Sequence, residues 1–217
     1  MSIRRSLFLI GGILASLGMV GIGLMASMRN PLGWLYVFAG LGYGLGGTLY
    51  LTFERGLGVS LAEAGDRTLW AIVPGFTAIF FGPPLEYLFL PEILPRTRVM
   101  LALGLGLCVA ALLLRVWTRL ELRQMYSGRL RIQQGHTLIQ KGPYRFLRHP
   151  GYAGFLLLAI GLALGFSSII GVAAIPLLML PGLAYRIAVE EKLLEAKFGP
   201  EYRDYALRTR RLVPGIW

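Results

Sequence analysis

The sequence predicts an all-α membrane protein, a polytopic bundle of five to six transmembrane helices with a helical hairpin near its C-terminus. Two observations predict this class. Hydrophobic residues make up 55% of the 217 residues and charged residues only 15%, whereas a soluble domain carries about a quarter charged residues. Long apolar runs also alternate with short basic segments along the chain, a pattern typical of membrane proteins that cross the bilayer several times.

Four apolar runs near residues 7–28, 32–53, 69–90 and 98–117 are long enough to cross a bilayer, which takes about 20 residues per helix. The first run follows Arg4 and Arg5, as the core of a signal peptide would. It is longer than the roughly 7–15 apolar residues of such a core, so we interpret it as a retained helix.

The run 151–185 is too long for one crossing. Gly165, Ser167 and Ser168 interrupt it, so it is predicted to form two helices folded into a hairpin. We therefore divide the chain into a scaffold of four spans, residues 1–118, and a part that comprises a connector, the hairpin and cytoplasmic helices, residues 119–217. The two parts are expected to form one integrated domain.

Charge placement predicts the orientation. With both termini in the cytoplasm, every one of the 22 Lys and Arg residues except Arg29, Arg96 and Arg98 lies on the cytoplasmic side. This asymmetry follows the positive-inside rule. Topology and contact with anionic membrane lipids account for the net charge of +11, so a nucleic-acid partner is not predicted.

The sequence does not predict a metal site or a disulfide within the chain. Cys108 is the only cysteine and lies inside an apolar run. His136 and His149 are the only histidines, and their spacing matches no familiar zinc-ligand pattern.

Glycines in the first half are interpreted as places where helices pack closely, because small residues let helix backbones approach in lipid. This interpretation applies to the cluster Gly40, Gly42, Gly44, Gly46 and Gly47, and to Gly104 and Gly106.

Pro83 and Pro84 should kink or end the third span, and Glu86 follows them in apolar surroundings. An ionisable group at membrane depth usually faces a cavity or a partner. The alternative is that Glu86 is solvated at the outer interface. If Glu86 belongs to the functional site, it is expected to bind the substrate.

Two polar clusters flank the predicted hairpin. The segment GPYRFLRHPGY, residues 142–152, places tyrosines, arginines and a histidine around Pro143 and Pro150, and is predicted to be a shaped turn. The segment 186–202 contains Arg186, Glu190 and Glu191, which should open a helix that Gly199 and Pro200 end. Because both clusters leave the hairpin on one side, they should converge into a small-ligand pocket.

The C-terminal part of the chain resembles a known group, the integral-membrane methyltransferases of the isoprenylcysteine carboxyl methyltransferase and phospholipid N-methyltransferase type. The resemblance rests on GPYRFLRHPGY, the later R-x-x-x-E-E, FG, EY and the terminal RLVPGIW. The resemblance covers roughly residues 130–217, and the N-terminal spans contribute nothing to it. It implies a cytoplasmic site for S-adenosylmethionine (AdoMet), with a lipophilic acceptor that enters from the bilayer.

The resemblance also implies site residues. Those that would bind the cofactor are Gln133, His136, Thr137, Leu138, Ile139, Tyr144, His149, Pro150, Gly151, Tyr152 and Glu190, with Glu191 as a neighbouring acceptor. Arg186 is the catalytic and substrate-binding candidate, because a guanidinium group holds a carboxylate or phosphate well. The acceptor is left open among carboxylate, amine, thiol and phenol. A carboxylate requires no general base, whereas an amine would have to lose a proton, for which Glu86 is a candidate.

Two other functions remain open at this point. Membrane sterol reductases have a similar C-terminal signature and use a nicotinamide cofactor, whose phosphates Arg145 and Arg148 would contact. A non-catalytic membrane module would use the same arginines to bind anionic lipid. Binding of AdoMet or of NADPH distinguishes these alternatives.

Overall fold

The computed structural model describes residues 3–41, 68–122 and 138–213. These residues are helical or irregular and include no strand, which confirms the all-α class. The chain divides into two compact units. The first comprises Met1–Gly65 with Pro84–Ile93, and the second comprises Asp66–Pro83 with Leu94–Trp217.

In the first unit, helix α1 (Ile3–Ser27) occupies the first predicted span, and residues 33–41 are helical where the second begins. Close packing at Gly40 is confirmed, since a Cβ atom there would lie 2.9 Å from the Ser16 carbonyl oxygen. The Ser16 hydroxyl also donates to the Gly40 carbonyl at 2.6 Å. Gly42, Gly44, Gly46 and Gly47 lie outside the described residues.

Helix α3 (Thr68–Phe89) fills the third predicted span and continues through Pro83 and Pro84. The helix therefore does not end at these prolines, and the alternative that they kink it stays a prediction; transmembrane helices tolerate proline because neighbouring groups satisfy the freed backbone. Glu86 is only 3% exposed, so the alternative that it is solvated is also wrong. Its proposed contact with substrate stays a prediction.

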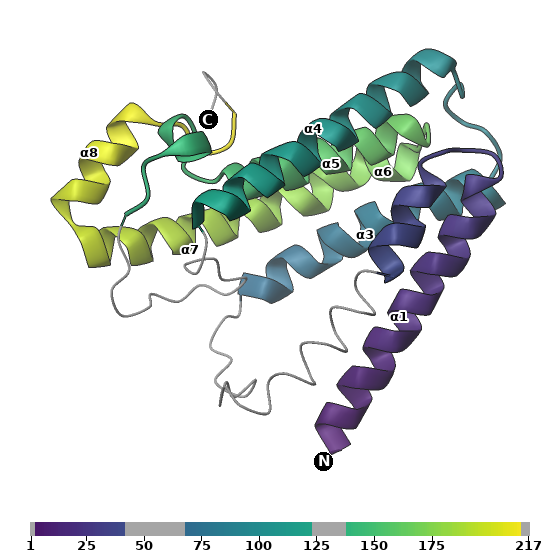
Figure 1. Ribbon diagram of the computed structural model, residues 1–217, viewed down its shortest axis with the longest axis horizontal. Helices are drawn as coiled ribbons and strands as arrows, with labels where there is room; N and C mark the ends of the chain where they lie inside the picture. Colours follow the sequence, from purple (N-terminus) through teal and green to yellow (C-terminus); the bar gives the residue numbers. More distant parts are fainter. Residues whose placement is uncertain (1–2, 42–67, 123–137, 214–217) are drawn as a thin grey trace. The chain divides into compact units, whose positions relative to one another are not determined.

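The second unit places α4 (Arg98–Leu122) along α5 (Pro150–Gly165), as Figure 1 shows. A Cβ atom on Gly104 would lie 2.5 Å from the Cα of Gly165, so close packing is confirmed there. At Gly106 no heavy atom of the described residues lies within 4 Å of such a Cβ, so the packing interpretation is wrong for that residue. Gly106 simply faces outward on the same helix.

These two glycines give a matched test of the packing. Gly104→Ala should lower the free energy of unfolding by about 1–3 kcal/mol, because two backbones must separate to admit the methyl group. Gly106→Ala should leave it unchanged or slightly raised, since alanine favours helix. Thermal unfolding in detergent, followed by circular dichroism, measures both. Equal stability of the two variants would contradict the packing role.

The predicted hairpin is confirmed. Helix α5 ends at Gly165, Ser167 has a φ of 51°, and the Ser168 side chain accepts from the Gly171 amide at the start of α6 (Ile169–Ala174). The chain continues through the π-helix η4 (Ile175–Met179) into α7 (Leu180–Phe198). Arg186 and the two glutamates therefore do not open a new helix; they lie inside the second helix of the hairpin.

Three helical stretches are long and apolar enough to span a membrane, namely Ala71–Phe89, Arg98–Leu122 and Ile169–Phe198. Two shorter apolar helices, Leu14–Ser27 and Pro150–Gly165, accompany them in the described part of the chain. The protein is therefore an integral membrane protein, while the count of five to six crossings stays a prediction. The stretch Ile169–Phe198 has 30 residues, about 45 Å of helix. The hydrocarbon core is about 30 Å thick, so this stretch is longer than a perpendicular crossing requires.

Helix α7 ends where the sequence predicted. Gly199 adopts a φ of 54°, a left-handed conformation that glycine tolerates, and Pro200 begins α8 (Pro200–Arg208). Helix α8 then turns away from the end of α7, and the chain after it returns to the turn before α5 (Figure 1).

Candidate functional site

The turn before α5 has the shape that its two prolines predict. Residues Gly142–Arg145 form the 3₁₀-helix η3, with Pro143 in its first turn. His149 occupies the N-cap position of α5 and Pro150 its first helical position, where proline needs no amide hydrogen. The His149 side chain is consequently fixed at the junction of the turn and the helix.

A segment after α8 closes this turn by backbone pairing. The amides of Arg148 and His149 donate to the carbonyls of Arg210 and Arg211 at 2.7 and 3.1 Å, and the Arg210 amide donates to Phe146 at 3.1 Å. The Tyr205 hydroxyl lies 2.8 Å from the Tyr144 carbonyl oxygen. Burial raises the pKa of Tyr205 to about 12, so this hydroxyl keeps its proton at neutral pH.

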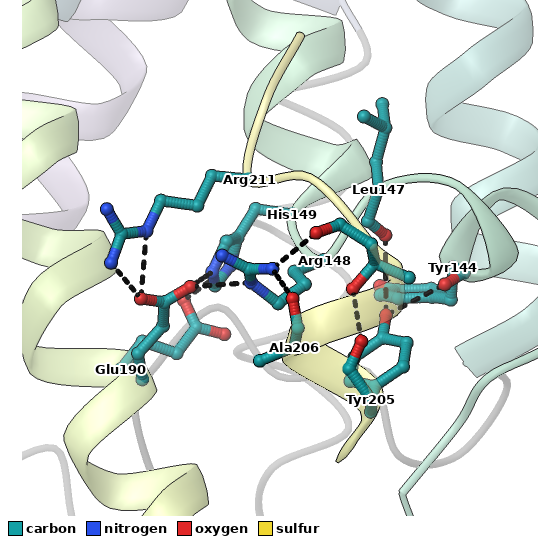
Figure 2. Close-up of polar contacts among 10 residues, drawn as sticks. Tyr144, Leu147, Arg148, His149, Glu190, Tyr205, Ala206 and Arg211 are labelled. Atoms are coloured by element: carbon teal, nitrogen blue, oxygen red, sulfur yellow. Dashed lines mark hydrogen bonds and ion pairs between the residues drawn. The ribbon is translucent and has the colours of Figure 1, made fainter. Parts of the chain in front are cut away.

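Arg148 and Arg211 both bind the carboxylate of Glu191. Arg148 Nε lies 2.8 Å from Glu191 Oε1, and Arg211 Nη2 lies 2.7 Å from Glu191 Oε2. Arg148 Nη1 also donates to the carbonyls of Ala206 and Thr209 at the end of α8, at 2.7 and 2.6 Å. Basic groups commonly satisfy the last carbonyls of a helix in this way. Figure 2 shows both arginines converging on the acidic side chains of α7.

The side chain of His149 is 2% exposed and lies between two carboxylates. Its Nε2 is 3.4 Å from Glu191 Oε1, and its Nδ1 is 3.6 Å from Glu190 Oε2. The ring also stacks on Tyr152, with centroids 5.7 Å apart. The predicted convergence of the turn and the acidic segment of α7 is thereby confirmed.

Glu190 differs from its neighbour. Its Oε2 is buried and has no hydrogen-bond partner in the described part of the chain, although the side chain as a whole is 28% exposed. Glu191, by contrast, accepts from two guanidinium groups. The two consecutive carboxylates therefore have different chemical roles, and only that of Glu190 retains an oxygen with unused capacity to accept a hydrogen bond.

Arg186 lies one turn before Glu190 and is 3% exposed. Its Nε donates to the Tyr152 hydroxyl at 2.8 Å, and its Nη1 donates to the Thr68 hydroxyl at 2.7 Å. Arg186 is thus joined to α5 and α3 as well as to its own helix. A buried guanidinium in this position is suited to hold an anionic group.

The structure brings together His149, Pro150, Tyr152, Arg186, Glu190 and Glu191 of the predicted set, and anchors the backbone of Tyr144 beside them. Gly151 lies in the first turn of α5. Leu138 and Ile139 are half-buried in an irregular segment. Gln133, His136 and Thr137 lie outside the described residues, so their roles stay predictions.

Sequence reasoning missed four residues of this region: Thr68, Tyr202, Tyr205 and Arg211. Tyr202 is 4% exposed and its hydroxyl has no hydrogen-bond partner among the described residues; burial raises its pKa. Arg211 is bound to Glu191, and that hydrogen bond raises its pKa. Tyr202 of the EY pair and Arg211 of RLVPGIW were part of the quoted resemblance but were given no role, and nothing in the sequence pointed to Thr68 or Tyr205.

Comparison with known proteins agrees with the resemblance. Residues 102–196 match the isoprenylcysteine carboxyl methyltransferase (ICMT) family. The match begins within α4, so the expectation that the N-terminal spans contribute nothing to the resemblance is wrong for the fourth span.

Two curated relatives match over part of the chain. A probable protein-S-isoprenylcysteine O-methyltransferase of Oryza sativa subsp. indica is 36% identical over 88 residues, which are 41% of this chain and 46% of that protein. The cobalt-zinc-cadmium resistance protein CzcN of Cupriavidus metallidurans is 34% identical over 121 residues, which are 54% of this chain and 50% of that protein. The aligned segments thus span about half the length of these curated relatives.

A solved structure shares the fold. The eukaryotic intramembrane Ras methyltransferase ICMT superposes with a TM-score of 0.54 and 21% sequence identity, over 98% of this chain and 75% of that chain. The resemblance predicted from the turn and the R-x-x-x-E-E segment is therefore confirmed, since residues 102–196 match the isoprenylcysteine carboxyl methyltransferase family.

Proposed function

We propose that this protein transfers a methyl group from AdoMet to the carboxylate of a lipophilic, membrane-resident acceptor. The observation that carries the proposal is the buried Oε2 of Glu190, which makes no hydrogen bond within the described residues and lies 3.6 Å from His149 Nδ1. The family match supports methyl transfer, and the names of relatives support a carboxylate on an isoprenylated cysteine.

The residues present fit AdoMet. Its α-amino group and ribose hydroxyls are donors, and Glu190 offers a carboxylate oxygen that lacks one. The stacked rings of His149 and Tyr152 offer an aromatic surface next to this carboxylate, and such surfaces attract cationic groups. Gln133, His136, Thr137, Leu138, Ile139, Tyr144 and the segment Pro150–Gly151 complete the proposed cofactor-binding set.

AdoMet, when bound, supplies an electrophilic methyl group. The protein then has to align the acceptor and exclude water, since a displacement on carbon depends on geometry. Arg186 is buried and its guanidinium is held by Tyr152 and Thr68, so it can orient an acceptor carboxylate without rearranging. A carboxylate needs no general base, so Glu86 is not required as a base in such a reaction.

Arg186→Gln should lower kcat with a carboxylate acceptor about a hundredfold, because the acceptor loses a bidentate charged partner. The affinity for AdoMet should change less than threefold. Methyl transfer from radiolabelled AdoMet measures turnover, and calorimetric titration measures affinity. Arg203→Gln is the control, since the Arg203 side chain is 64% exposed on α8. Equal losses of turnover and AdoMet affinity would contradict the acceptor role.

The decisive experiment is a screen of prenylated and lipid acceptors with radiolabelled AdoMet, followed by identification of the product. A methyl ester, which alkali cleaves, is the expected product. A stable N-methyl or S-methyl product would retain methyl transfer and contradict the carboxylate. Binding of NADPH instead of AdoMet would support a reductase, and binding of neither would support a lipid-binding module. The geometry weighs against the reductase, because Arg148 is already bound to Glu191 and to the carbonyls of Ala206 and Thr209 at the end of α8.

A further inference from the structure

Thr68 lies outside the family-matched segment 102–196 and at the first residue of α3, yet it contacts the central arginine of the site. Its hydroxyl accepts a hydrogen bond from Arg186 Nη1 at 2.7 Å. The two residues are 5% and 3% exposed, respectively. A hydrogen bond between a buried charge and a buried hydroxyl is stronger than a neutral one at the surface.

The contact is a consequence of how α3 and α7 pack. A Cβ atom on Gly75 would lie 2.8 Å from the Cα of Met179, and one on Gly182 would collide with the carbonyl oxygen of Ala71. The helix backbones therefore touch at both places, which only glycine permits. On α3 the contacts run from Gly75 through Ala71 to Thr68. Their partners run from Met179, at the end of η4, through Gly182 to Arg186 on α7, so the two helices are antiparallel in this register.

This register has a chemical result. The glycine contacts fix α3 against α7, and one turn beyond them Thr68 faces Arg186. The Tyr152 hydroxyl on α5 accepts a hydrogen bond from Nε of the same guanidinium at 2.8 Å. The Arg186 side chain is therefore bound by two different helices, through Nε to α5 and through Nη1 to α3. Such a pair of contacts selects one rotamer of a long side chain that otherwise has many.

We propose that Thr68 is a positioning residue for the acceptor. It holds the Arg186 guanidinium in the orientation that receives the acceptor's anionic group. The inference rests on the proposed methyl transfer, and it assigns a residue of the N-terminal half to the reaction. Thr68 contacts neither cofactor nor acceptor in this proposal; it acts through Arg186.

The test compares Thr68→Val, which removes the hydroxyl at nearly constant volume, with Thr68→Ser, which keeps it. Thr68→Val should lower kcat/KM for a prenylated carboxylate acceptor about tenfold or more, with AdoMet affinity unchanged. Thr68→Ser should stay within about threefold of the wild type. The matched control is Thr118→Val on α4, because Thr118 is equally buried but donates only to its own helix, to Leu114 at 2.8 Å.

Unchanged acceptor kinetics of Thr68→Val in an active enzyme would overturn the positioning role and leave methyl transfer intact. Equal losses in Thr68→Val and Thr68→Ser, or an equal loss of AdoMet affinity, would also overturn it. A double-mutant cycle of Thr68→Val with Arg186→Gln, followed by thermal unfolding, should show coupling between the two residues whatever the reaction is. Additive effects would overturn the contact itself. A wild-type protein that binds no AdoMet and transfers no methyl group would contradict the proposed function instead.

Discussion

Glu190→Gln should weaken AdoMet binding about tenfold to a hundredfold, because a hydrogen bond to a charged group contributes about 1.5–3 kcal/mol. The buried Oε2 of Glu190 makes no hydrogen bond within the described residues, so the substitution affects only its 3.6 Å contact with His149 Nδ1 there. The thermal unfolding temperature should therefore change little. Calorimetric titration of the detergent-solubilised protein with AdoMet measures the affinity.

A matched control lies one turn further along the same helix. Glu195 is 53% exposed and 3.7 Å from Arg203, a surface pair of little energetic value. Glu195→Gln should bind AdoMet like the wild type. If Glu190→Gln also bound AdoMet normally, Glu190 would not be a cofactor ligand, and the proposed site would lose the observation on which it depends.

Glu191→Gln should lower the free energy of unfolding by about 2–4 kcal/mol, since removing one member of a largely buried ion pair leaves the other uncompensated. Two guanidinium groups depend on this carboxylate, and the side chain of Arg148 is only 11% exposed. Denaturant unfolding in detergent, compared with Glu190→Gln, measures the difference. Any loss of AdoMet binding should follow the loss of folded protein.

The opposite pattern would contradict this assignment. A Glu191→Gln variant as stable as the wild type, with reduced AdoMet affinity, would make Glu191 a ligand, as the sequence predicted. Arg211→Gln provides a second measurement, because it removes one of the two cations from Glu191. Its effect should be smaller than that of Glu191→Gln, since the Arg211 side chain is 38% exposed.

The sequence predicted that the two polar clusters of the candidate site converge, because the topology of the hairpin alone decides this. A hairpin returns the chain to the side from which it left, so the turn before Pro150 and the segment with Glu190 must emerge together. The sequence did not distinguish Glu190 from Glu191, because both match the same motif. The difference comes from Arg148 and Arg211, and the position of Arg211 depends on backbone pairing between residues far apart in the chain.

Helix boundaries were predictable where glycine, serine or proline changes the backbone, as at Gly165 and Gly199. They were not predictable where an apolar helix continues into a polar one, because helical propensity does not change there. The helix from Leu180 to Phe198 is the example. Gly104 and Gly106 show a second limit, because the sequence does not reveal which face of a helix packs against a neighbour. Positions two residues apart lie on different faces of the helix, and only Gly104 meets a neighbouring backbone.

The pairing of residues 146–149 with residues 210 and 211 has a consequence for biosynthesis. A ribosome produces the turn first, then both arms of the hairpin, and only afterwards the residues that close it. While the hairpin inserts into the bilayer, Glu191 of the nascent chain still lacks Arg211. The closed form of this region can therefore arise only after residues 210 and 211 have been synthesised.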